Sequence, residues 1–325
     1  MQTVQSAINT SVASSPQEDS MAEAITPTEL VDALVRFIGS FSIETTPKEG
    51  ARISSFSDHL ERGRRVYIAH VAGTPYAELI SFAARLRREG FEPVMHLTAR
   101  DMPSKAMLSD TVARYVGESG ATQILLIAGD MPSPTGEYAD TITILRTGLL
   151  EKNGIKTIGL AGHPEGSKAI GEARLREALK AKNAYAKETD AKLHLVTQFG
   201  FEPEPFIEWE RRIREDGLNS LPIHIGIPGL ASFPTLLRFA VECGVGASVR
   251  ALRSRAGSLA KLAMVAQPDD LVLGIARYCA RTPNTLIAAP HFFPFGGLKK
   301  TAEWLKAIQA RRIELTSNAS GFTVR

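Results

Sequence analysis

The sequence contains only two cysteines, Cys243 and Cys279, and they lie far apart in apolar surroundings. So few cysteines exclude a disulfide-stapled fold and fit a reducing compartment, so we expect a cytoplasmic protein. The chain also lacks long hydrophobic runs. No stretch approaches the roughly 18 uninterrupted apolar residues that a membrane-spanning helix needs. We therefore expect no contact with a membrane.

The chain also has no large excess of positive or negative charge. The chain has 38 Lys and Arg against 35 Asp and Glu, a net charge of +3, and no long basic run. A nucleic-acid-binding surface needs concentrated basic charge, so we expect no nucleic-acid partner. The seven histidines are dispersed, without the spacings typical of metal ligands, which predicts no metal site. A Gly-x-Ser-x-Gly hydrolase motif is absent as well.

The ends of the chain differ in composition from its middle. Residues 1–24 are rich in Ser, Thr, Gln, Ala and Glu without apolar periodicity, which predicts a flexible tail without a secretion signal. Thr26 and Glu29 have the spacing of a capping box, which predicts the start of the first helix. We assign residues 25–316 to one catalytic domain and expect residues 317–325 to be a loose end.

Eight short apolar or β-branched runs recur along the chain, and amphipathic helical patterns lie between them. Such alternation predicts βαβ units with a parallel sheet, and eight units in this length predict a (β/α)₈ TIM-type barrel. A doubly wound open sheet is the alternative, although no Gly-x-Gly-x-x-Gly follows the first run. The runs are Phe41–Glu44, Val66–His70, Pro93–Thr98, Gln123–Ala128, Lys156–Leu160, Leu193–Thr197, Pro222–Ile227 and Thr285–Ala288.

Polar side chains gather where these runs end. Barrel enzymes carry their chemistry at the carboxyl ends of the strands, so we expect these side chains to share one pocket. In chain order they are Glu44, His70, His96 with Thr98, Asp130, His163, Gln198, Pro228-Gly229 and Pro290-His291.

Several of these strand ends resemble, in order, motifs of the methylenetetrahydrofolate reductase family. Thr197-Gln198-Phe199-Gly200-Phe201 is similar to the family's Thr-Gln-Phe-Phe-Phe, and Pro222–Gly229 is similar to its Pro-Ile-x-Pro-Gly-Ile-x-Pro segment. The other matching fragments are Ser42–Pro47, His96-Leu97-Thr98, Gly129-Asp130-Met131-Pro132, Tyr138-Ala139-Asp140 and His163-Pro164-Glu165.

The resemblance implies reduction of 5,10-methylenetetrahydrofolate to 5-methyltetrahydrofolate, with NADH or NADPH supplying a hydride through FAD. Glu44 would be the general acid that protonates the departing amine, and Asp130 would stabilise the iminium cation. A carboxyl group must be buried, with a raised pKa, to hold its proton at neutral pH. From the residues alone, Glu44 could instead pair with an arginine, and Asp130 could cap the turn at Pro132.

The resemblance also implies binding roles. Gln198 would bind the pterin, Phe239 would stack on nicotinamide or the folate benzoyl ring, and Glu44 would contact the folate. A Gln pairing with backbone and a Phe packing in a helix core are the structural alternatives. The residues carried over as cofactor contacts are His96, Thr98, Gly129, Asp130, Tyr138, Ala139, His163 and Lys187.

One departure from the family motif bears on the cofactor. Ala128 stands where the family has an arginine before Gly-Asp, which removes a cation facing the flavin. Two alternatives therefore stay open: a flavin-independent reductase of the same fold with direct hydride transfer from NADH, and a non-catalytic folate-binding partner of a one-carbon methyltransferase. Assembly into a homo-oligomer is also open.

Overall fold

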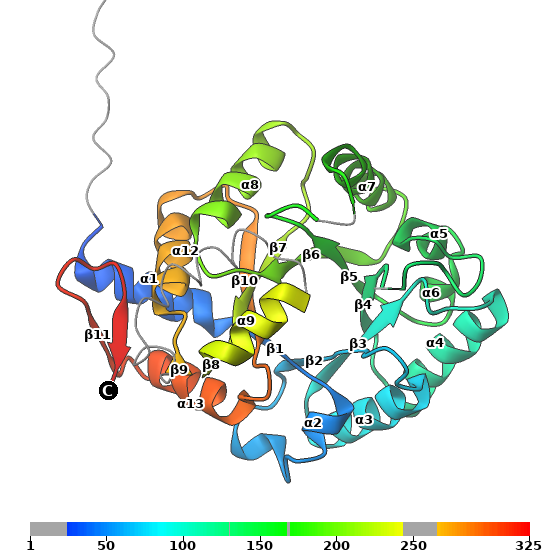
Figure 1. The fold of residues 1–325 in the computed structure, drawn as a ribbon, viewed down its shortest axis with the longest axis horizontal. Coiled ribbons are helices and arrows are strands. Elements are labelled where there is room, and N and C mark those ends of the chain that lie inside the picture. The colour runs from blue at the N-terminus through cyan, green and yellow to red at the C-terminus, as the bar shows by residue number, and fades with distance from the viewer. Residues whose placement is uncertain (1–24, 130, 168–169, 243–264) are drawn as a thin grey trace, which may run out of the picture.

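The computed structural model describes residues 25–129, 131–167, 170–242 and 265–325. Eight parallel strands close into a barrel with helices around it (Figure 1), which confirms the predicted (β/α)₈ fold. The open-sheet alternative is wrong, because β10 pairs with β1 through Ser42 and His291. In barrel order the strands are β1 Ser42–Thr45, β2 Arg65–Ile68, β3 Glu92–Thr98, β4 Gln123–Ile127, β5 Thr157–Gly162, β6 Lys192–Phe199, β7 Ile223–Pro228 and β10 Ile287–Phe293.

Each of the eight predicted runs overlaps a strand, but the last prediction has the wrong bounds. It ended at Ala288, whereas β10 continues to Phe293. Proline rarely lies inside a strand because it lacks a backbone N–H, yet Pro290 lies within β10. The β10–β7 pairing is already irregular between Ile287 and Ala289, and Pro290 then pairs with Ile225. His291 is therefore inside the barrel wall.

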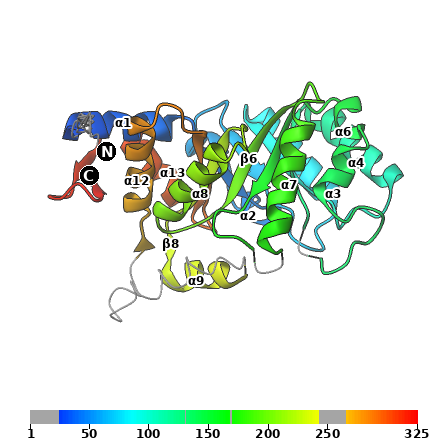
Figure 2. The ribbon, with the colours of Figure 1, turned by 90° about the horizontal axis from the view of Figure 1, so that it is seen from above.

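The helices follow the strands and cover the barrel from outside (Figure 2). The predicted capping box begins the first of them: Thr26 N donates to Oε2 of Glu29 at 2.8 Å, and Glu29 N donates to Oγ1 of Thr26 at 3.3 Å. The helices are α1 Pro27–Gly39, α2 Pro47–Gly50, the 3₁₀ helix η1 Phe56–Asp58, α3 Tyr76–Arg88, α4 Lys105–Ser119, α5 Thr141–Leu145, α6 Leu149–Lys152, α7 Glu172–Tyr185, α8 Glu204–Glu215, α9 Phe233–Glu242, α12 Asp269–Arg281 and α13 Leu298–Gln309. Among the described residues, none of these helices has the length and apolar character to cross a membrane.

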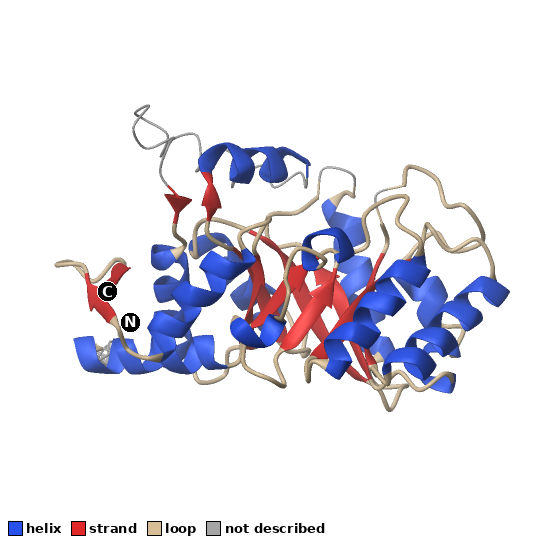
Figure 3. Cartoon of the chain, turned by 90° about the horizontal axis from the view of Figure 1, so that it is seen from below, coloured by secondary structure: helices blue, strands red, loops and turns tan. Residues whose placement is uncertain are grey.

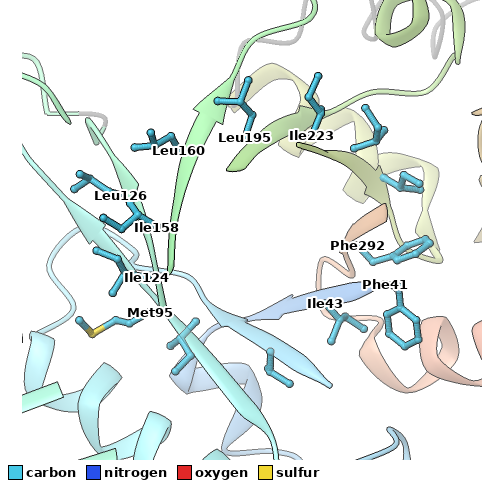
Figure 4. Close-up of a cluster of buried hydrophobic side chains, with 14 of the residues drawn as sticks. Phe41, Ile43, Met95, Ile124, Leu126, Ile158, Leu160, Leu195, Ile223 and Phe292 are labelled. Atoms are coloured by element: carbon cyan, nitrogen blue, oxygen red, sulfur yellow. The ribbon is translucent and has the colours of Figure 1, made fainter. Parts of the chain in front are cut away.

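The two faces of the strands differ in chemistry. Side chains such as Ile43, Leu126 and Phe292 belong to the main apolar core, whose members surround the ring of strands (Figure 4). Inside the barrel, polar side chains replace much of the branched apolar filling that is usual for this fold. Contacts between non-neighbouring strands identify them as inward-facing: Glu44 meets His96, and Tyr67 meets both His194 and His291.

Two small strand pairs lie outside the barrel. β8 Ala231–Ser232 pairs with β9 Val265–Ala266 beside α9, which lies over one end of the barrel (Figure 3). β11 Ile313–Leu315 pairs with β12 Phe322–Val324, so the expectation of a loose end at 317–325 is wrong. Phe322 fixes this end of the chain against the domain, because its side chain is buried and stacks on Trp304. The predicted tail, residues 1–24, and Cys243 lie outside the described residues.

Candidate active site at the carboxyl end of the barrel

Glu44 on β1 lies between two histidine side chains. Its Oε2 is 3.1 Å from Nε2 of His96 on β3 and 3.5 Å from Nε2 of His291 on β10. Nδ1 of His291 is 2.9 Å from Oγ of Ser42. The three atoms that meet at the carboxylate are buried and have no well-aligned hydrogen-bond partner in the protein. The cluster therefore has unused donor and acceptor capacity, as a site that binds a polar ligand would have.

The protonation of Glu44 differs from the expectation. Burial raises its pKa, but the imidazoles of His96 and His291 lower it by more. The resulting pKa is about 2. The raised pKa expected for this carboxyl group is therefore wrong for the protein without ligand. The sequence indicated the burial but not the two histidines, which come from other strands. Burial also lowers the pKa of His291, against the attraction of Glu44.

A second polar group lies deeper in the barrel. The hydroxyl oxygen of Tyr67 is 3.1 Å from Nε2 of His194, and the rings of His194 and His224 are 4.3 Å apart. Burial lowers the pKa of His194 to about 3 and also lowers that of His224. Both imidazoles are therefore neutral, and they fill the barrel as polar but uncharged side chains.

Thr98 lies at the exit of β3 and has its hydroxyl group in local hydrogen bonds. Its Oγ1 is 2.9 Å from Nδ1 of His70 and 2.8 Å from the hydroxyl oxygen of Tyr76. His70 is also bonded through Nε2 to the carbonyl of Thr74 at 2.8 Å, and Asp101 lies 3.6 Å from its Nδ1. Both nitrogens of His70 thus have protein partners.

The exit of β4 carries the residues that the resemblance places beside a flavin. Gly129 has φ +87°, and a Cβ there would lie 3.3 Å from the Cβ of Thr98. Asp130 lies outside the described residues. Tyr138 is buried, and Ala139 is exposed with its carbonyl accepting a hydrogen bond from Nε of Arg100 at 3.1 Å.

Lys182 of α7 reaches the barrel wall at the end of β5. Its Nζ donates to the carbonyl of Ala161 at 2.7 Å, and burial lowers its pKa to about 8. Burial and the charge of Lys182 lower the pKa of His163, which follows β5, to about 4. Lys187 is exposed between the end of α7 and the start of β6, at the opposite end of the barrel. The structure therefore does not bring Lys187 to the other predicted site residues.

Gln198 lies on an irregular part of β6. Val196 pairs with His224 and Phe199 with Gly226, so three steps along β6 match two along β7, as in a β-bulge. Gly226 N donates to Oγ1 of Thr197 at 2.8 Å, which holds the bulge. Gln198 lies on this bulge and is half-buried. Bulges are often found beside active sites, where they change the direction of a side chain.

Phe239 of α9 belongs to an aromatic cluster at the exits of β6 and β10. Its ring stacks on Phe295 with 4.3 Å between centroids and 19° between planes. Phe295 also meets Phe199 and Phe293. Phe295 has φ +48°, a conformation that non-glycine residues rarely adopt. These contacts hold it there.

Tyr67, Lys182 and the inward position of His291 next to Glu44 were not predicted from the sequence. The missed signal was the alternation of inward and outward residues along each strand, which places Ser42 with Glu44 and His291 with Phe293. Within the described ranges, no group of three His, Cys, Asp or Glu side chains is arranged to hold a metal ion.

Comparison with known proteins agrees with the motifs. A family model described as methylenetetrahydrofolate reductase matches residues 40–252. Methylenetetrahydrofolate reductase 1 of Schizosaccharomyces pombe is 27% identical over 216 residues, which cover 61% of this chain and 34% of that protein. Methylenetetrahydrofolate reductase 2 of the same yeast is 28% identical over 189 residues, which cover 54% of this chain and 28% of that protein. The chain therefore spans about a third of the length of these relatives.

A solved structure has the same fold. It is an uncharacterized protein from Clostridium thermocellum that binds two copies of 5-methyl-5,6,7,8-tetrahydrofolic acid, with a TM-score of 0.55 and 12% identity. The match covers 86% of this chain and 98% of that one. At this identity the likeness concerns the fold alone. The family match covers well over half of the sequence, and the chain belongs to the methylenetetrahydrofolate reductase family.

Proposed function

We propose that this chain reduces 5,10-methylenetetrahydrofolate to 5-methyltetrahydrofolate with a hydride from NADH or NADPH. The observation that carries the proposal is the position of Glu44, a carboxylate at the barrel exit with His96 and His291 at 3.1 and 3.5 Å. A protein that only binds folate has no need of a buried carboxylate that lies against two imidazoles, whereas a general acid does. Membership of the family and the folate ligand of the Clostridium protein support the substrate class.

The reaction needs one proton and one hydride. The bond between the methylene carbon and N10 of the folate breaks, the proton from Glu44 goes to N10, and an iminium cation remains at N5. A hydride then adds to the methylene carbon and gives the N5-methyl group. Gln198 would orient the pterin with its amide donor and acceptor, and Phe239 would stack on a planar ring of either reactant. Asp130 would stabilise the cation by its charge.

The described residues fit the implied FAD poorly. His96 turns into the barrel toward Glu44, and the hydroxyl of Thr98 is bonded to His70 and Tyr76. Lys187 is at the far end of the barrel. We therefore favour direct hydride transfer from the nicotinamide over the route through FAD. Binding of both reactants together would then place the two reacting carbons in contact.

Turnover of the purified chain tests the proposal. We expect 5-methyltetrahydrofolate to form from methylenetetrahydrofolate and NADH or NADPH, and Glu44→Gln to lower the rate by about 10²–10⁴-fold while folate binds within a few-fold. The matched control is Glu49→Gln, which changes a carboxyl group on α2. Folate binding without turnover would contradict the proposal and favour the binding-partner alternative. A visible flavin spectrum, or flavin binding on titration, would restore the route through FAD.

A further inference from the structure

Of the two histidines that contact the Glu44 carboxylate, His96 lies closer. The two atoms are 3.1 Å apart, and the exposed fractions of the two side chains are 9% and 16%. We propose that His96 stores the proton for Glu44, with its Nε2–H passing a proton to Oε2 of Glu44 as Glu44 protonates the substrate. This inference rests on the proposed function and gives His96 a role that differs from the expected cofactor contact.

His291 is less suited to store this proton. A carboxylate only accepts hydrogen bonds, so the Nε2 of His291 that faces Glu44 carries its hydrogen. Its Nδ1 then accepts from the hydroxyl of Ser42 at 2.9 Å. This neutral form has its single ring proton on the side of Glu44. His291 is fully buried, and burial lowers its pKa, so a second proton on it is disfavoured.

Tyr67, Glu49 and Arg65 are other titratable or charged groups that bear on the pair. Tyr67 on β2 is buried, which raises its pKa to about 12, so it stays neutral. Burial and the negative charge of Glu44 raise the pKa of Glu49 on α2, against the charge of Arg52. Arg65, at the start of β2, lowers the pKa of His291 further. Of the two imidazoles beside Glu44, His96 has the shorter contact, 3.1 Å against 3.5 Å for His291.

One proton moves from His96 through Glu44 to the substrate in each turnover. In this scheme the proton starts on Nε2 of His96, and Glu44, whose pKa is lowered to about 2, starts as a carboxylate. The proton leaves Nε2 of His96 for Oε2 of Glu44, and Glu44 delivers its proton to N10 as the bond from N10 to the methylene carbon breaks. Glu44 is again a carboxylate and His96 is neutral. A proton from water restores the imidazolium before the next turnover. His96 acts through Glu44 and is a positioning residue in this scheme.

The variant His96→Gln tests the inference in turnover. Glutamine keeps an N–H donor but cannot hold an additional proton. We expect hydride transfer at pH 7 to fall by about 10²-fold with the folate KM changed only a few-fold. Glu44 must then hold the proton alone, so the loss of rate with rising pH should move to lower pH by about one unit or more. The control is His224→Gln, a buried barrel histidine without a contact to Glu44, whose pH profile should match wild type.

A titration of the wild type, without turnover, tests the role of His96 independently of whether His96→Gln folds. The ring nitrogens of ¹⁵N-histidine report the protonation of His96 by NMR in the wild type and in Glu44→Gln. We expect His96 to bind a proton near neutral pH in the wild type, and its pKa to drop in Glu44→Gln. A His96 that stays neutral down to pH 5, or one unaffected by Glu44→Gln, overturns the inference. A wild type without reductase activity overturns the proposed function instead, whatever the titration shows.

Discussion

Tyr67 and His194 meet across the barrel from β2 and β6, with 3.1 Å between the tyrosine hydroxyl and Nε2 of the imidazole. Strands on opposite sides of a barrel are joined only through such interior contacts. His224 lies against His194 on the other side, with its ring 4.3 Å away. Neutral polar side chains therefore help to stabilise the barrel. Because these histidines are neutral when folded, the stability of the fold should depend on pH.

We predict that acid destabilises the fold below pH 6.5 through these histidines. The pKa of His194 is lowered to about 3 in the folded chain, and an unfolded histidine titrates near 6.5. Between these values the unfolded state binds more protons, so the free energy of unfolding falls as pH falls, by about 1.4 kcal/mol per pH unit for each such histidine. Urea unfolding at pH 7, 6 and 5 measures the slope. His194→Gln, which keeps a partner for Tyr67, should reduce it, and an unchanged slope would refute the assignment.

We predict that Gly226→Ala disturbs the bulge of β6. A Cβ at Gly226 would lie 2.6 Å from the carbonyl oxygens of Thr197 and Gln198, and these backbone atoms cannot move without distorting the strand. The expected loss of stability is about 1–3 kcal/mol. Thermal unfolding measures it, with Gly39→Ala as the control, because a Cβ there meets nothing within 4 Å. Equal effects of the two variants would show that the close packing at Gly226 is not real.

Two Glu–Arg pairs with the same separation should differ in their effect on stability. Glu210 is fully buried: Oε1 accepts from Arg214 at 2.8 Å and from Leu286 N at 2.9 Å, and Oε2 accepts from Tyr278 at 2.7 Å. Glu118 is exposed and 2.8 Å from Arg114. We expect Glu210→Ala to cost about 3–5 kcal/mol, because buried donors are left unpaired.

Glu118→Ala is the matched control for that loss. Because water replaces the lost partner of an exposed arginine, we expect it to cost at most about 1 kcal/mol. Chemical unfolding of the two variants gives the comparison. A loss at Glu118 as large as that at Glu210 would contradict the view that burial decides the contribution of these pairs.

We predict that Gln198→Ala weakens folate binding and slows folate reduction. The loss should correspond to about 1–3 kcal/mol, because a polar edge of the pterin would be buried without its partner. Nicotinamide binding should be nearly unchanged, since Gln198 is expected to contact the folate. Binding of each ligand by calorimetry separates the two effects. A parallel loss of both affinities would mean that Gln198 supports the fold of the bulge and has no specific role with the folate.

The sequence by itself determined the class of fold and most of the strand exits. Alternating apolar runs and helical patterns are local signals, and they placed strands in all eight predicted runs. The capping box at Thr26 was predictable for the same reason, since both its hydrogen bonds join residues three apart. The motifs around His96, Gly129 and Gln198 indicated the family that the comparison shows.

Only the tertiary structure decided which side chains meet inside the barrel. Closure brings β10 beside β1, so His291 reaches Glu44 and Ser42 from the other end of the chain. The charges of surrounding groups then determine the pKa of a buried carboxyl group, which is why burial alone led to the wrong direction for Glu44. Likewise, the course of α7 brings Lys182 to the barrel wall and leaves Lys187 at the opposite end, because helical geometry and strand order fix the end at which each residue lies.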